Sequence, residues 1–193
     1  MLGLPQKVTG CLFDLDGVLT RTAIVHARAW AAMFDDFLRE RARRHGEPPQ
    51  PFTPDDYTRY VDGRPRLDGT RSFLQSRGID LPEGSAVDPA GAETVNGLSN
   101  RKNELVLRLL DEGGVEVFEG SVRYVRAVRQ AGLRTAVVSS SANTAQVLDA
   151  AGIADLFEAR IDGVVAAQRS LAGKPAPDTF LAGAEALGLD ADA

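Results

Sequence analysis

Apolar residues are spaced differently in successive parts of the chain, and the spacing predicts where its strands and helices lie. A short apolar run, residues 8–13, predicts a buried strand that ends at the turn from Asp14 to Gly17. A helix follows, because apolar residues recur at the i, i+3, i+4, i+7, i+8 spacing of one buried stripe. That stripe consists of Trp30, Met33, Phe34, Phe37 and Leu38. Gly46 is expected to end the helix.

The middle of the chain has no convincing strand pattern. Residues 47–56 form a proline-rich break, and helices are predicted at 65–78 and 98–112 with a loop at 80–97 between them. We therefore expect an all-helical unit.

The last part alternates strand and helix, which predicts a parallel α/β sheet. The expected elements are a helix at 120–131, a strand at 134–138, a helix at 142–151, a strand at 161–165 and a helix at 177–187. Because the helical block separates the first strand from its partners, we interpret that block as an insertion. The expected domains are a core formed by 1–26 and 107–193 and an inserted helical domain at 27–106.

Composition narrows the class of protein. The 193 residues are 44% hydrophobic and 25% charged, as in an ordinary globular protein, and a net charge of -5 gives no reason to expect nucleic acid or an anionic membrane as partner. No apolar run is long enough to span a bilayer, and the N-terminus lacks a secretory signal pattern. A single cysteine, Cys11, fits a reducing cytosol, so a cytoplasmic protein is expected.

Four polar side chains are predicted at one edge of the sheet, since the carboxyl ends of parallel strands meet there. Asp14 and Asp16 follow the first strand, Ser139 follows the strand at 134–138, and Lys174 lies in the loop GKPAPD. Two carboxylates, a hydroxyl and an ammonium suit a phosphate and a divalent cation such as Mg²⁺. A carboxylate can attack phosphorus, while serine and lysine hold the other phosphoryl oxygens.

Each of these features alone has an ordinary structural explanation. A D-x-D-G turn is more often structural than catalytic, and a serine after a strand commonly caps a helix. Lys174 precedes a proline and could be a solvated loop residue. Only the combination is specific.

The segments DLDGVLT, VVSSSAN and GKPAPD, in this order and separated by a helical insert, resemble the haloacid dehalogenase-like phosphotransferases. The β-phosphoglucomutase-like branch is the most similar. The resemblance runs through nearly the whole chain and implies an α/β fold, with a Rossmann-like parallel-sheet core and an inserted helical cap.

The resemblance also implies roles for the residues that match. Asp14 is expected to be the nucleophile that becomes phosphorylated and a Mg²⁺ ligand. Asp16 is expected to be the general acid/base, with its main-chain carbonyl on the metal. Ser139 and Lys174 are expected to bind phosphate; Ser140 is an alternative, but the alignment favours Ser139.

In the cap, His26 matches a histidine associated with coupling cap closure to Asp16, and Arg66 matches an arginine that binds the distal phosphate of a sugar bisphosphate. Alternatively, His26 is a core histidine at a helix end and Arg66 a surface cation. The remaining matches to substrate-contacting positions are Lys102, Asn103, Ser141 and Asn143.

The chain departs from the family pattern at two places. Arg21 stands where the family usually has an aspartate. A fourth family motif, an acidic pair that completes the Mg²⁺ site, has no counterpart before the sequence ends at LGLDADA, and Asp190 and Asp192 are poor substitutes. We therefore expect a C-terminally incomplete core, weak Mg²⁺ binding, little turnover and self-association through an open sheet edge.

Three functions remain open. The resemblance favours a β-phosphoglucomutase activity that interconverts β-glucose 1-phosphate and glucose 6-phosphate through a phospho-aspartate. A sugar-phosphate phosphatase with the same machinery is the alternative. The third possibility is an inactive module of a larger sugar enzyme. In each case a small sugar phosphate is the expected partner.

Overall fold

The computed structural model describes residues 2–190, which divide into two compact units. The core unit contains the described parts of 1–23 and 114–193, and the helical unit contains 24–113. Among residues 2–190, no helix is both long and apolar enough to cross a membrane.

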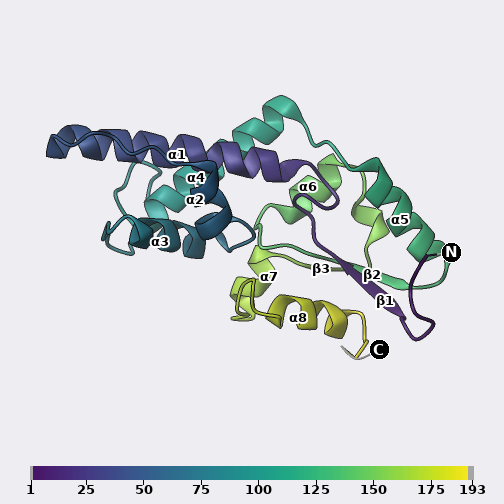
Figure 1. Ribbon diagram of the computed structural model, residues 1–193. Helices are drawn as coiled ribbons and strands as arrows, with labels where there is room; N and C mark the ends of the chain where they lie inside the picture. The colour runs from purple at the N-terminus through teal and green to yellow at the C-terminus, as the bar shows by residue number, and fades with distance from the viewer. Residues whose placement is uncertain (1, 191–193) are drawn as a thin grey trace. The chain divides into compact units, whose positions relative to one another are not determined.

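A parallel three-stranded sheet forms the centre of the core unit, with the strands in the order β1-β2-β3 (Figure 1). The strands are β1 (Gly10–Phe13), β2 (Arg134–Val138) and β3 (Ala159–Ile161). Phe13 pairs with Val137, and Val138 pairs with Ile161, so all three strands run toward the same edge. The parallel α/β fold expected from the alternating pattern is confirmed.

Helices cover both faces of this sheet. They are α5 (Glu119–Gln130), α6 (Thr144–Ala150), η2 (Ala154–Leu156, a 3₁₀ turn), α7 (Gly163–Gln168) and α8 (Asp178–Ala186). Figure 1 shows α5 and α8 on opposite faces. Gly183 lets α8 approach closely, because a Cβ there would lie 3.1 Å from a methyl group of Val138 and 3.3 Å from one of Leu12.

The prediction of a strand at 161–165 is wrong. The third strand ends at Ile161, and α7 begins at Gly163. Asp162 causes the change, because its buried carboxylate accepts hydrogen bonds from the main-chain N–H groups of Val164 and Val165 and so caps a helix. A run of valines suits a strand by propensity, but this cap decides otherwise.

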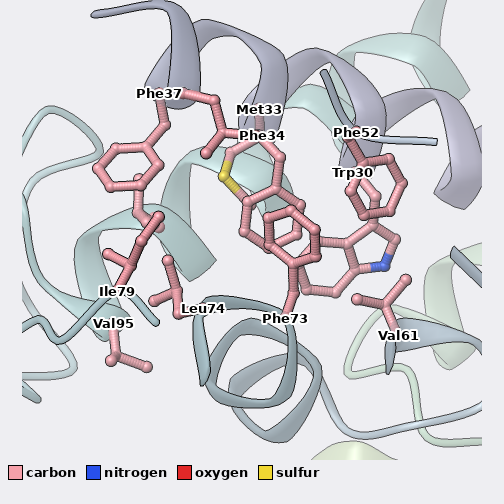
Figure 2. Close-up of a cluster of buried hydrophobic side chains, with 12 residues drawn as sticks. Trp30, Met33, Phe34, Phe37, Phe52, Val61, Phe73, Leu74, Ile79 and Val95 are labelled. Carbon is pink, nitrogen blue, oxygen red and sulfur yellow. The ribbon is translucent and has the colours of Figure 1, made fainter. Parts of the chain in front are cut away.

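The helical unit packs around a cluster of aromatic side chains (Figure 2). Its elements are α1 (Thr22–His45, in this unit from residue 24), α2 (Pro54–Asp56), η1 (Tyr57–Val61, a π-helix), α3 (Arg66–Ser76) and α4 (Val95–Gly113). The ring centroids of Trp30 and Phe34 lie 5.3 Å apart, and those of Phe34 and Phe73 lie 4.0 Å apart. The predicted apolar stripe of α1 is thus buried in this cluster.

Two local capping signals account for helical residues that the sequence prediction missed. Thr53 and Asp56 form a capping box at the start of α2, inside the proline-rich break. Thr94 Oγ1 accepts a hydrogen bond of 2.9 Å from the N–H of Gly97, which caps α4, so that helix begins at Val95 rather than at residue 98.

Candidate active site

The turn after β1 carries the two predicted carboxylates. Leu15 is fully buried, and its carbonyl accepts hydrogen bonds from the N–H groups of Leu19 and Thr20, which close the turn. Gly17 has a φ of +83°, a conformation that favours glycine. Asp14 and Asp16 flank the buried leucine and are themselves only partly buried.

Asp14 is paired with the predicted lysine. Lys174 Nζ lies 2.8 Å from Asp14 Oδ1 and also donates to the carbonyl oxygen of Val138 at 3.2 Å. The ammonium lies 5.1 Å from the centre of the Phe180 ring. The cation is therefore held at the carboxyl end of β2, directly against the proposed nucleophile.

Asp16 is held by two hydroxyl groups. Ser139 Oγ donates to Asp16 Oδ2 at 3.1 Å, and Thr22 Oγ1 donates to Asp16 Oδ1. Ser139 Oγ in turn accepts a hydrogen bond of 3.1 Å from the N–H of Ser141. Each oxygen of this carboxylate thus has a donor, which fixes the direction in which it points.

The structure therefore brings the four predicted core residues together, although they come from three separate segments. Ser139, the serine that the alignment favours, contacts Asp16. Ser141 and Asn143 lie in the turn that leads to α6, where Ser141 Oγ accepts from the N–H of Asn143 at 3.2 Å.

In the helical unit, Lys102 and His26 are in direct contact. Lys102 is only 5% exposed, and its Nζ lies 2.7 Å from His26 Nδ1 and 4.8 Å from the centre of the Trp30 ring. Because an ammonium group can only donate, Nδ1 must be the acceptor, and a neutral His26 then carries its proton on Nε2. Asn103 is the next residue of α4 and is partly buried.

Arg66 is the first residue of α3 and is half-buried. Among the described residues, its Nε is a buried atom with no hydrogen-bond partner. Burial lowers the pKa of its guanidinium below the usual range. A buried donor without a partner is costly, so this arginine is suited to an anionic ligand.

Sequence reasoning missed the contribution of two threonines. Thr20 and Thr22 are both buried, and their hydroxyl oxygens lie 2.6 Å apart. The sequence DLDGVLTRT does place both threonines directly after the aspartate turn, one on each side of Arg21.

The acidic side chains of this site are few. Within residues 2–190, no three His, Cys, Asp or Glu side chains gather closely enough to hold a metal ion. Asp190 follows α8, and Asp192 lies outside the described residues. Weak Mg²⁺ binding therefore stays a prediction.

Comparison with known proteins identifies the protein family. A sequence model of the haloacid dehalogenase-like hydrolases matches residues 8–193. The chain is 57% identical to a β-phosphoglucomutase of Mycobacterium tuberculosis over 194 aligned positions, which cover all of this chain and 74% of that protein. It is 39% identical to an uncharacterised glycosyl hydrolase of the same species, over 92% of this chain but only 13% of that protein.

Solved structures show the same fold. The crystal structure of a β-phosphoglucomutase from Clostridium difficile superposes with a TM-score of 0.73 at 24% identity, over 94% of this chain and 72% of that one. The protein is therefore a phosphotransferase or phosphatase of the haloacid dehalogenase-like family. Within this family, it belongs to the β-phosphoglucomutase-like branch.

Proposed function

We propose that this protein is a Mg²⁺-dependent β-phosphoglucomutase that interconverts β-glucose 1-phosphate and glucose 6-phosphate through a phosphorylated Asp14. The observation that carries the proposal is that the two carboxylates have different partners. Asp14 lies against an ammonium group, whereas Asp16 is held by hydroxyl groups. The 57% identity to a β-phosphoglucomutase supports the choice of reaction.

Asp14 is the nucleophile of this proposal. One of its carboxylate oxygens attacks phosphorus, a P–O bond to Asp14 forms, and the bond from phosphorus to the sugar oxygen breaks. Lys174, 2.8 Å from Oδ1, offsets the repulsion between the carboxylate and an approaching phosphate. The Asp14 side chain is 36% exposed, so a substrate can reach it.

Asp16 transfers the proton. In its protonated form it gives a proton to the sugar oxygen that leaves, and in the return step it takes the proton from the hydroxyl group that attacks phospho-Asp14. Ser139 and Thr22 orient its carboxylate for both steps. The phosphoryl group thus passes between Asp14 and the sugar, and the proton passes between Asp16 and the sugar.

The residues present fit Mg²⁺ in part. This cation takes oxygen ligands, often only one or two carboxylates together with phosphate oxygens and water. Asp14 would supply a carboxylate oxygen and Asp16 its main-chain carbonyl. When bound, Mg²⁺ would neutralise charge on the phosphoryl group.

The helical unit supports a mutase rather than a phosphatase. A mutase must hold a second phosphate of a sugar bisphosphate, whereas a phosphatase need not. Arg66 has a buried Nε without a partner among the described residues, and Lys102 is a nearly buried cation of the same unit. Two such cations suit a doubly phosphorylated sugar.

The deciding assay offers β-glucose 1-phosphate with Mg²⁺ and a trace of the bisphosphate, and follows glucose 6-phosphate against free phosphate. We expect more glucose 6-phosphate than free phosphate, even at low total turnover. Release of free phosphate alone would replace the mutase by the phosphatase. Arg66→Ala should reduce mutase turnover more than phosphate release, while Arg64→Ala, an exposed neighbour, serves as the matched control.

A further inference from the structure

Arg21, which replaces the usual aspartate of the family, makes two specific contacts within the core unit. Its Nε lies 3.4 Å from a carboxylate oxygen of Glu116. Its guanidinium carbon lies 4.5 Å from the centre of the Phe118 ring. The Arg21 side chain is 51% exposed and contacts the segment that contains Glu116 and Phe118.

The main chain around Arg21 is tied to the same segment. Thr20 and Val117 form an antiparallel bridge. The N–H of Arg21 donates to the carbonyl of Glu116 at 2.9 Å, and the N–H of Phe118 donates to the carbonyl of Leu19 at 2.8 Å. Side-chain and main-chain contacts of Arg21 and its neighbours therefore hold residues 19–21 beside residues 116–118.

The neighbours of Arg21 differ from it in exposure. Thr20 and Thr22 are buried, whereas the arginine between them is half exposed. Thr22 Oγ1 donates to Asp16 Oδ1 and lies 2.6 Å from Thr20 Oγ1. A fixed position of residues 20–22 thus fixes one donor to the Asp16 carboxylate.

We propose that Arg21 is a positioning residue for Asp16, and that it acts by tying residues 19–21 to Glu116 and Phe118 so that Thr22 stays aligned with the carboxylate. The inference rests on the proposed function, because it assumes that Asp16 transfers a proton to the sugar oxygen. Arg21 itself touches neither the substrate nor the reacting atoms.

Loss of this alignment has a specific chemical signature. A sugar alkoxide is a poor leaving group and needs the proton of Asp16, whereas acetate leaves from acetyl phosphate without one. Arg21→Ala should lower kcat with β-glucose 1-phosphate by about threefold to tenfold, with KM changed by less than about twofold. Phosphorylation of Asp14 by acetyl phosphate should keep its wild-type rate.

Two further variants separate positioning from general damage. Arg21→Lys keeps the charge near Glu116 and should restore part of the lost kcat. Arg39→Ala removes a similarly exposed arginine, paired with Asp36 on α1, and should leave both reactions unchanged. Equal losses with the sugar phosphate and with acetyl phosphate, or no loss with either, would overturn the proposal.

Amide hydrogen exchange gives a readout that does not depend on activity. In Arg21→Ala, the N–H of Phe118 should exchange at least about threefold faster than in the wild type, because its hydrogen bond to Leu19 lies within the loosened segment pair. Unchanged exchange at Phe118 would overturn the proposal by itself. A wild type that turns over no sugar phosphate would instead refute the proposed function. The exchange measurement would still decide whether Arg21 holds residues 19–21 against residues 116–118.

Discussion

Lys174 in the core unit and Lys102 in the helical unit are held in similar ways by different chemistry. Each ammonium group lies about 5 Å from an aromatic ring, that of Phe180 or Trp30, and within hydrogen-bond distance of one further side chain. For Lys174 that side chain is the Asp14 carboxylate, and for Lys102 it is the imidazole of His26.

The difference shows how the two cations depend on their surroundings. Lys174 Nζ lies 2.8 Å from the Asp14 carboxylate, so the positive charge of the lysine lies beside the nucleophile. The position of Lys102 requires His26 to be unprotonated at Nδ1, because a protonated nitrogen cannot accept a hydrogen bond. In both units, the lysine thus lies near a ring and beside a nitrogen or oxygen atom of another side chain.

The largest expected effect comes from Asp14→Asn, which removes the anion from the Lys174 pair. The neutral amide is a poor nucleophile, so turnover should fall by at least about 10³-fold and no phosphoenzyme should form. Mass spectrometry of the intact protein after incubation with acetyl phosphate measures this. Asp155→Asn, at an exposed aspartate of the core unit, is the control. Substantial turnover by Asp14→Asn would refute the nucleophile assignment.

Lys174→Met removes the cation from the same pair and should lower kcat/KM by about 10²-fold to 10³-fold, because Asp14 then faces the phosphate without a neighbouring positive charge. Lys174→Arg should recover only a small part, since a planar guanidinium does not reproduce a compact ammonium between Asp14 and the Val138 carbonyl. Full activity of Lys174→Met would show that the pair is structural only.

Lys102→Met tests the other lysine, with an expected loss of about tenfold to 100-fold in kcat/KM. Its stability should be unchanged or higher, because methionine has a similar length and avoids the cost of burying an ammonium group. Urea unfolding followed by the fluorescence of Trp30, the single tryptophan, reports on the helical unit. A loss of stability with unchanged kinetics would contradict a functional role for this lysine.

The smallest expected effect concerns Asp56, which belongs to the helical unit. Burial would raise the pKa of its carboxyl, but hydrogen bonds from Thr53 and Arg77 outweigh burial and hold the pKa below its usual range. A lowered folded-state pKa stabilises the protein above the unfolded pKa of about 3.9 and loses that stabilisation as the pH falls further.

Asp56→Asn should therefore lower the free energy of unfolding by about 1 kcal/mol at pH 7. The difference from the wild type should shrink as the pH falls below about 4, because Asp56 in the unfolded chain becomes protonated there before the folded-state carboxyl does. Urea unfolding at pH 7 and pH 3.5 checks both statements. A difference that is equal at the two pH values would show that the charge of Asp56 is irrelevant.

Sequence patterns predicted the parts of the fold that depend on periodic burial. The stripe of α1 and the strand at 134–138 follow directly from spacing and apolar runs. The prediction failed at residues 161–165, because one buried aspartate, Asp162, determines the start of α7. The π-helix at Tyr57–Val61 has no periodic signal of its own and was not predicted.

The site was predicted to a similar extent and for a related reason. Parallel strands bring their carboxyl ends to one edge, so the proximity of Asp14, Asp16, Ser139 and Lys174 follows from topology. The hydroxyl group of Thr22 and the direction of Arg21 depend on the local course of the chain after the turn. Only the structure shows that Thr22 is buried against Asp16 while Arg21 is half exposed.

The bridge between Thr20 and Val117 also bears on how such a chain can change during evolution. The helical unit begins at residue 24 and ends at residue 113, so its two ends leave the core within a few residues of a single hydrogen-bonded pair. A segment whose ends are this close can be exchanged for another, or shortened to a loop, without altering the register of β1 and β2. One contiguous gene segment can thus be replaced while Asp14 and Asp16 of the core unit stay unchanged.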